Sequence, residues 1–596
     1  MTSTISPVGQ VRDDAVPVVA AVEAAPVHLR PIGPDAGCAV LTLAVLAVAV
    51  TDPGHPAWAG TALALAAVAV GWGGGPAFHS AWAAMRRGAV TVDTLTGVGL
   101  LAVAATALIA ALGHPADLGP TVVAAAAATL RCAGGAVEGR LTAADGQAHG
   151  DGPVERARRG AAVLQRAADR AVGGFAAVVV VLAVATLGFW LGTGAGALTA
   201  LGAAAAVLLV GCPHAVGRAA GTALVVGTSR AAALGAFLDG PRSAEALARV
   251  DTVVLCRTGT LTTGARALQA VHVADGVDAD EALRIAGAVA AAGREAGGAA
   301  GTHPVGAVVA DAARTRFGTL PGVAEFDGYP GLGVRGIVTE LLTCADACSD
   351  ACADTCDEPR VMAHAALVGR VSLLGAHGID LPADLGDALT EIHARGATAV
   401  AVSWDGVARA LLEVVDPVRP GVPDAVDGLR ALGLRPVVLT GDDEGAARGL
   451  ATALAVEEVV AEVRPADRGD AVARLREAGR TVAVVAGPGD EAALAAADVA
   501  LGRNGAVRLA GTGVALRDDD PLTAVDALRT ARRTARTVER TITGSAAYHL
   551  VAVPLAATGL LHPLAAALAA ACYPVVALLH AAALRRVPAL PRPDPA

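Results

Sequence analysis

The sequence predicts an α-helical membrane domain of about eight spans, joined to a cytoplasmic α/β domain that carries a second, inserted domain. Three observations predict this class. Of the 596 residues, 54% are hydrophobic and only 17% are charged, against roughly a quarter charged in soluble chains. Several apolar segments approach the ~20 residues that cross a hydrocarbon layer. Between them, a long segment alternates short apolar runs with helical stretches, as buried parallel strands do.

The apolar segments agree with an asymmetry of charge across the membrane. The short connections at 52–56, 113–118, 193–196 and 561–562 carry no arginine, whereas the connections on the other side are rich in it. The positive-inside rule therefore places both termini and the segment 220–540 in the cytoplasm of a multi-pass plasma-membrane protein. The predicted spans are 36–51, 57–73, 93–112, 119–138, 173–192, 197–219, 541–560 and 563–582.

The segment 220–540 has the pattern of a parallel sheet whose loops meet at one edge. Three apolar runs end just before Cys256, Thr440 and Ala486. Loops at the carboxyl ends of parallel strands converge, so these residues are expected to share a site. The pattern is interrupted over 265–415, which is long enough for an inserted domain. Ala-rich stretches at 284–293, 422–432, 444–454 and 467–478 predict helices.

Charge and cysteine content exclude several classes of function. The net charge is −10 and no basic tract occurs, which argues against a nucleic-acid partner. Nine cysteines, an odd number, do not form the pattern of a secreted disulfide framework. The polar first 35 residues lack the pattern of a cleavable signal.

Short motifs recur in a fixed order along the chain. They are Cys212-Pro213-His214, Cys256-Arg257-Thr258-Gly259-Thr260-Leu261-Thr262, His303-Pro304, Gly331-Leu332-Gly333-Val334-Arg335-Gly336, Asp416-Pro417-Val418-Arg419-Pro420 and Thr440-Gly441-Asp442. With these motifs the chain resembles the heavy-metal-transporting P-type ATPases of copper or zinc type over nearly its whole length. They correspond to that family's CPC or CPH, DKTGTLT, His-Pro, GxGVxG, DPxRP and TGD motifs.

The resemblance implies a haloacid-dehalogenase-like phosphorylation domain with an inserted α+β nucleotide-binding domain. It divides the chain into a cytoplasmic tail (1–35), spans 1–4 (36–138), an actuator-domain remnant (139–172), spans 5–6 (173–236), the phosphorylation-type domain (237–264 and 416–530), the nucleotide-binding-type domain (265–415) and spans 7–8 (541–586).

The same resemblance implies roles for individual residues. The catalytic positions are Cys256, Thr258, Thr440, Gly441, Asp442, Arg468 and Asp490. The nucleotide-binding positions are His303, Pro304, Gly331 and Gly333. The metal positions are Cys212 and His214 in the membrane, and a cytoplasmic four-residue repeat that contains Cys344, Cys348, Cys352 and Cys356.

Three departures from the family pattern bear on catalysis. Cys256 stands in place of the family's phosphorylated aspartate. Ala486 stands in place of a carboxylate residue of the family's GDGxND loop. Mg²⁺ is a hard cation that prefers oxygen ligands, so Mg²⁺ binding is doubtful. The roughly thirty residues that remain of the actuator domain contain no TGE loop, and 154–171 is expected to form a cytoplasmic helix.

Each candidate site has a plainer interpretation. Cys256 is either a new nucleophile or a position that has lost its chemistry. Cys212 and His214 either contact copper or zinc or are leftovers, and His549 with Cys572 offers a different site. The glycines near 331 either hold ATP or only form a turn. The cysteine repeat either binds metal or thiol-redox partners, or arose by repeat slippage.

The sequence therefore favours a membrane protein that binds metal or nucleotide but has lost autophosphorylation. The expected partners of such a protein are membrane lipids, a heavy-metal cation, and either an intact P-type ATPase, whose activity it would modulate, or a metal chaperone. The alternatives are an active ATP-driven copper or zinc exporter and a Cys256-dependent phosphatase or thiol-redox protein.

Overall fold

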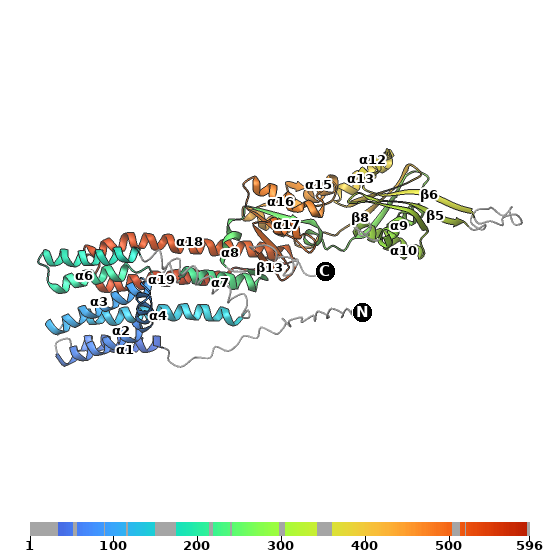
Figure 1. Ribbon diagram of the computed structural model, residues 1–596. Helices are drawn as coiled ribbons and strands as arrows, with labels where there is room; N and C mark the ends of the chain where they lie inside the picture. Colours follow the sequence, from blue (N-terminus) through green and yellow to red (C-terminus); the bar gives the residue numbers. More distant parts are fainter. Residues whose placement is uncertain are drawn as a thin grey trace, which may run out of the picture.

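A bundle of long helices and two β-sheets lie at opposite ends of an elongated molecule (Figure 1). The helix α18 runs from the sheets into the bundle, and the β5–β6 hairpin projects away from it. The computed structural model describes residues 34–51, 56–88, 90–114, 117–148, 174–213, 219–238, 241–296, 304–342, 360–503, 513–518 and 520–592.

The bundle is built from helices whose sequences are rich in alanine, valine and leucine. Such helices pack closely because small side chains let their backbones approach. They are α1 (Pro34–Thr51), α2 (Pro56–Met85), α3 (Val92–Gly113), α4 (Gly119–Ala148), the helix Gly174–Gly192, α6 (Ala197–Val210), α7 (Ala220–Ala233), α18 (Pro521–Ala557) and α19 (Pro563–Ala583).

Each predicted span overlaps a helix among the described residues, but several bounds differ. By length and hydropathy, five of the described helices can cross a membrane, and α1 and α6 are shorter apolar helices. Within the predicted sixth span, 197–219, the helix is interrupted. Its helix ends at Val210, and Gly211, Cys212 and Pro213 are not helical, because proline cannot continue the hydrogen-bond ladder. The predicted seventh span is only the end of the 37-residue helix α18.

The first sheet is the predicted parallel one. Within the described residues it has seven strands in the order β1-β13-β12-β11-β2-β9-β10, parallel except for β1 against β13. The strands are β1 (Ala236–Leu238), β2 (Thr252–Cys256), β9 (Arg435–Leu439), β10 (Glu458–Val460), β11 (Val482–Val485), β12 (Val499–Arg503) and β13 (Gly513–Leu516).

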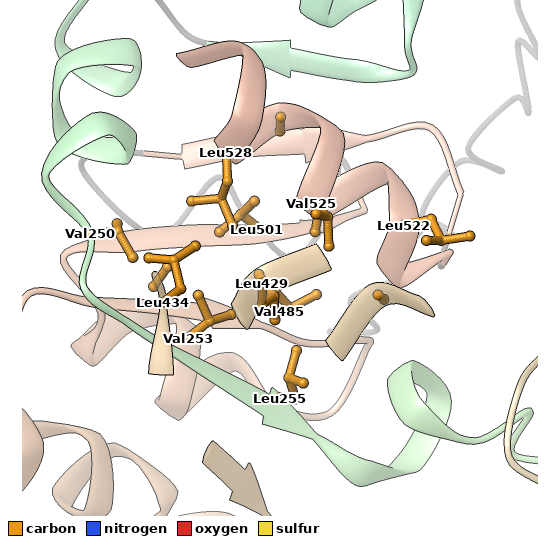
Figure 2. Close-up of a cluster of buried hydrophobic side chains, with 14 of the residues drawn as sticks. Val250, Val253, Leu255, Leu429, Leu434, Val485, Leu501, Leu522, Val525 and Leu528 are labelled. Carbon is orange, nitrogen blue, oxygen red and sulfur yellow. The ribbon is translucent and has the colours of Figure 1, made fainter. Parts of the chain in front are cut away.

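An apolar core holds this sheet to its helices. Figure 2 shows Val253, Leu255 and Val485 of the strands beside Leu429 and Val525 of the helices. Burying each such side chain contributes about 1.5–3 kcal/mol, which makes this core the main stabilising element of the domain. The surrounding helices are α8 (Pro241–Arg249), α14 (Val422–Ala431), α15 (Glu444–Ala453), α16 (Arg468–Glu477), α17 (Glu491–Ala496) and the start of α18.

The second sheet lies between β2 and β9 in the sequence, where an insertion was expected. Its six described strands are antiparallel neighbours in the order β3-β8-β7-β6-β5-β4. They are β3 (Ala267–Val273), β4 (Gly322–Tyr329), β5 (Gly333–Leu342), β6 (Arg360–Gly369), β7 (Thr398–Trp404) and β8 (Val407–Val415). The accompanying helices are α9 (Ala279–Ala296), α10 (Pro304–Phe317), α12 (Val371–Ala376) and α13 (Ala383–Ala394).

Several sequence predictions fall outside the described residues. These are the tail up to residue 33, the helix expected over 154–171, His214, His303 and the repeat of Cys344, Cys348, Cys352 and Cys356.

Candidate functional site

Three loops meet at the carboxyl edge of the parallel sheet, as the strand pattern predicts. The strand β2 lies between β9 and β11, with Cys256 opposite Leu439 and Leu255 opposite Val485. Thr440 and Ala486 are the next residues after Leu439 and Val485. The loops beginning at Cys256, Thr440 and Ala486 are therefore neighbours on three adjacent strands.

Cys256 is a buried thiol in an apolar environment. Its side chain is 1% exposed and belongs to a cluster that includes Leu439, Val484 and Ala486. Burial raises the pKa of the Cys256 thiol from 9.0 to about 12, and the positive charge of Arg468 offsets only part of that shift. The thiolate is the nucleophilic form of cysteine, so the buried thiol is unreactive at neutral pH.

Asp490 and Arg468 form an ion pair beside this cluster. Asp490 is 3% exposed and its Oδ1 contacts Nη1 of Arg468, the first residue of α16. A Cβ atom built on Gly441 would lie 3.6 Å from Arg468 Nη2, so the guanidinium also lies against the 440–442 loop. The carboxylate that remains from the GDGxND pattern is thus already neutralised by an arginine.

Asp442 is also paired with an arginine. Its Oδ2 contacts Nη1 of Arg257, which is 5% exposed and donates a further hydrogen bond from Nη2 to Gly396 O at 3.3 Å. The Thr440 hydroxyl donates to Asp442 Oδ2 at 2.7 Å and accepts from Asp442 N at 3.1 Å. These contacts fix the Thr440-Gly441-Asp442 loop.

The turn after Cys256 is held by Asp416 and two arginines. Asp416 accepts hydrogen bonds from Thr262 Oγ1 and Gly264 N, each at 2.9 Å. Arg266 donates to Thr258 Oγ1 at 2.9 Å, and Arg419 Nη2 donates to Gly259 O at 3.2 Å. The Thr258 hydroxyl is therefore engaged by a neighbouring guanidinium.

The glycines of the candidate nucleotide loop lie across from this edge. Gly331 has a φ of +77°, and Gly333 pairs with Gly369 of the neighbouring strand. Arg370 donates from Nε to Gly331 O at 2.9 Å and from Nη2 to Gly441 O. One side chain thus joins the two loops.

Helices α13 and α15 form another contact between the two sheet domains. His393 Nε2 lies 3.1 Å from Asp443 Oδ1. The Asp443 carboxylate caps α15 by accepting from Ala446 N at 2.9 Å. Burial alone would raise the pKa of Asp443, but the hydrogen bonds from His393 and Ala446 N–H outweigh burial and lower it.

The membrane site surrounds Cys212, just after α6. Its thiol donates to Val92 O at 3.6 Å and lies 3.3 Å from Thr96 Oγ1. A cavity of about 90 Å³ opens beside it, lined by side chains of α3, α4, α6 and α19 that include Thr96 and Arg131. Arg131 pairs with Asp93 at 3.3 Å, so this part of the bundle contains partly buried charge.

The structure does not bring His549 and Cys572 together as a pair of metal ligands. His549 Nδ1 lies 2.6 Å from Ser545 O, and the described residues include no hydrogen-bond partner for the buried His549 Nε2. Cys572 is exposed. Among the described residues, no three His, Cys, Asp or Glu side chains gather as a metal site, and His214 is not among those residues.

The edge around Cys256 does not fit Mg²⁺ as the family motifs would bind it. Cys256 and Ala486 supply no carboxylate, and Asp442 and Asp490 each contact an arginine. A hard divalent cation requires several oxygen ligands free of competing cations. The charges of Arg257 and Arg468 at this edge are in turn compensated by these two aspartates.

Comparisons with known proteins agree with this architecture. The model of the haloacid dehalogenase-like hydrolase family matches residues 250–498. The chain is 34% identical over 436 residues to "Probable copper-exporting P-type ATPase V" of Mycobacterium tuberculosis (strain CDC 1551 / Oshkosh), covering 73% of this chain and 53% of the relative. It is 36% identical over 421 residues to "Copper-exporting P-type ATPase" of Mycobacterium tuberculosis (strain ATCC 25618 / H37Rv), covering 70% and 50%.

The chain belongs to the heavy-metal-transporting P-type ATPase family. A crystal structure of a zinc-transporting PIB-type ATPase in the E2.Pi state has the same fold, with a TM-score of 0.53 at 20% identity over 93% of this chain and 99% of that one. This P-type ATPase relative is a multi-pass membrane protein with cytoplasmic α/β domains. It spans about half the length of the curated relatives it matches.

Several residues of these sites were not predicted from the sequence. They are Arg370, His393, Thr96 and the Arg131–Asp93 pair. Arg131 was detectable as a charge inside an apolar segment, which is costly and therefore informative. The others contact their sites only through long-range folding, so local patterns give no signal for them.

Proposed function

We propose that this P-type ATPase relative is a membrane protein that binds metal or nucleotide without forming a phosphoenzyme. The observation that carries the proposal is that Cys256 and Ala486, which stand where the motif resemblance implies two carboxylates, lie in one apolar cluster at the edge of the sheet. An aspartyl phosphate cannot form on a thiol, and the thiol itself is held protonated by burial.

The charges that remain at this edge support the same proposal. Asp442 and Asp490 are tied to Arg257 and Arg468. Phosphoryl transfer depends on metal ions or other cations placed to stabilise charge on the transferring group. Arginines locked to carboxylates offer much less of that stabilisation. The high pKa of Cys256 likewise argues against a thiol-dependent phosphatase.

The metal half of the proposal rests on Cys212 and the cavity beside it. A thiol and an imidazole are suitable ligands for copper or zinc, and the family relatives are named as copper exporters. We propose a heavy-metal cation as the ligand of this site, with His214 as a second ligand and both termini in the cytoplasm. A metal chaperone or an intact P-type ATPase is the proposed protein partner.

The test is phosphorylation of the purified full-length protein by radiolabelled ATP in the presence of Mg²⁺ and Cu⁺, Zn²⁺ or Co²⁺. We expect no hydroxylamine-sensitive phosphoprotein and no metal-stimulated ATP hydrolysis. Copper or zinc should nevertheless bind, and Cys212→Ser should weaken that binding.

The alternative function is ATP-driven export of copper or zinc. Metal-stimulated hydrolysis that vanadate inhibits would support the exporter and contradict our proposal. A label that survives acid and is released by hydroxylamine would do the same.

A further inference from the structure

Arg370 connects the candidate nucleotide loop to the phosphorylation-type loop. It follows the last residue of β6 and precedes α12, so it belongs to the inserted domain. Its guanidinium donates to Gly331 O at 2.9 Å within that domain and to Gly441 O across the domain boundary. Its own backbone N–H donates to Leu332 O at 2.8 Å.

The backbone around Arg370 leaves little freedom for its position. A Cβ atom on Gly333 would lie 2.4 Å from Val368 O, and one on Gly369 would lie 2.3 Å from Leu332 O. Real Cβ atoms do not approach that closely, so the loop and the strand end are in direct backbone contact. Any ligand held by the Gly331–Gly333 loop therefore lies close to the Arg370 guanidinium.

Arg370 differs from the arginines around it in its partners. Arg257, Arg464 and Arg468 each pair with an aspartate. The hydrogen-bond partners of the Arg370 side chain in the described part of the chain are two backbone carbonyls. A neutral carbonyl is a weaker acceptor than a phosphate oxygen, which binds guanidinium with charge assistance and often through two bonds.

We propose that Arg370 is a phosphate-binding residue that selects nucleoside di- and triphosphates over nucleosides. When a nucleotide binds the Gly331–Gly333 loop, one of its phosphates replaces Gly441 O as a hydrogen-bond acceptor of the Arg370 guanidinium. The contact between the two loops is then released, while the His393–Asp443 contact remains. This inference rests on the proposed nucleotide binding and names the group that gives it phosphate specificity.

The experiment compares ADP with adenosine on the full-length protein in detergent, with EDTA present. For the unmodified protein we expect ADP to bind about tenfold more tightly or better, the size of effect a charge-assisted hydrogen bond gives. Arg370→Gln should remove that preference and leave adenosine affinity unchanged. Arg370→Lys should keep part of it, because the charge remains and the planar fork is lost.

The matched control is Arg316→Gln on α10 of the same domain. Arg316 is largely exposed and pairs with Asp280 at 2.7 Å, and an exposed pair of this kind contributes little. This variant should keep the full ADP preference. Hydrogen exchange at residues 440–443 gives a second readout, because ADP should speed it in the unmodified protein and not in Arg370→Gln.

The outcomes separate the inference from the function beneath it. An unchanged ADP preference in Arg370→Gln contradicts the inference, and so does an equal loss of ADP and adenosine binding. If the unmodified protein binds neither ligand, the nucleotide half of the proposed function is wrong, and the role of Arg370 falls with it.

Discussion

The residues at the edge of the parallel sheet differ from a phosphorylation site in charge more than in position. Cys256, which the motif resemblance matches to the family's nucleophile, contacts apolar side chains. Asp490, which the same resemblance matches to a family carboxylate, contacts Arg468. The side chains at these two positions are therefore neutral or already paired.

Cys256 is expected to resist alkylation in the native protein. Because burial raises its thiol pKa to about 12, only about one molecule in ten thousand carries the thiolate at pH 8. Iodoacetamide modification, followed by mass spectrometry, should stay slow from pH 7 to pH 10 and become fast once the protein is denatured. The raised pKa also means that stability falls as pH rises from about 9 towards 12, because the unfolded thiol ionises first. Fast native alkylation at pH 8 would contradict the buried thiol.

Arg468→Gln is expected to destabilise the protein strongly. The change leaves Asp490 as a buried carboxylate without its partner, which costs about 3–5 kcal/mol. Adding Asp490→Asn should recover most of the loss, because a neutral amide does not need the guanidinium. Thermal unfolding of Arg468→Gln, Asp490→Asn and the double variant measures the coupling. Independent, additive losses would show that the two side chains do not act as a pair.

Among the elements, the parallel strands were predictable and the contact between the domains was not. Strands β2, β9 and β11 appear in the sequence as apolar runs that stop at small or polar residues, and this local pattern fixes both their position and their shared edge. The contact between α13 and α15 has no such pattern. It depends on two glycines of α15, Gly445 and Gly449, where a Cβ atom would collide with His393 of α13. The need for glycine at these positions cannot be inferred until the partner helix is known.

Gly449→Ala is expected to separate α13 from α15. A Cβ atom at this position would lie 1.9 Å from His393 O, which is backbone and has no room to move. We expect a loss of about 2 kcal/mol or more, since overpacking of this kind costs 1–3 kcal/mol. Differential scanning calorimetry should show a lower unfolding temperature.

Gly386→Ala is the control for this prediction. It lies within α13, and a Cβ atom there meets nothing within 4 Å. Alanine is the better helix former, so this variant should gain up to about 1 kcal/mol. Equal effects of the two substitutions would contradict the close packing of α13 on α15.

At the scale of the whole molecule, the residues after α19 return to the parallel sheet domain. Arg230 of α7 donates from Nε to Val587 O at 2.8 Å. Leu590 packs against the core of the sheet domain. Arg592 donates to Asp520 Oδ2 at 3.1 Å. The segment 587–592 therefore joins the membrane helices to the base of the cytoplasmic domain.

Replacing Leu590 with Ala and Arg592 with Gln together is expected to weaken that connection. The loss of a partly buried leucine and of the ion pairs of Arg592 with Asp520 and Asp526 should cost about 1–3 kcal/mol. For a domain of this size that is a decrease of several degrees, roughly 2–4 °C per kcal/mol. Arg448→Gln, which removes only an exposed pair with Glu444, should leave the unfolding temperature unchanged. An equal shift in both would contradict the role of the segment.

The length of α18 has a mechanical consequence. Its 37 residues form one helix from the sheet domain into the bundle, about 55 Å long at 1.5 Å per residue. A rod of that length converts angle into displacement: a tilt of about 5° at one end moves the other end by about 5 Å. A sideways displacement of that size changes which neighbouring side chains the far end of α18 contacts. A small rotation of the sheet domain would thus displace Tyr548 and His549 by a few ångströms. This displacement does not require phosphoryl transfer.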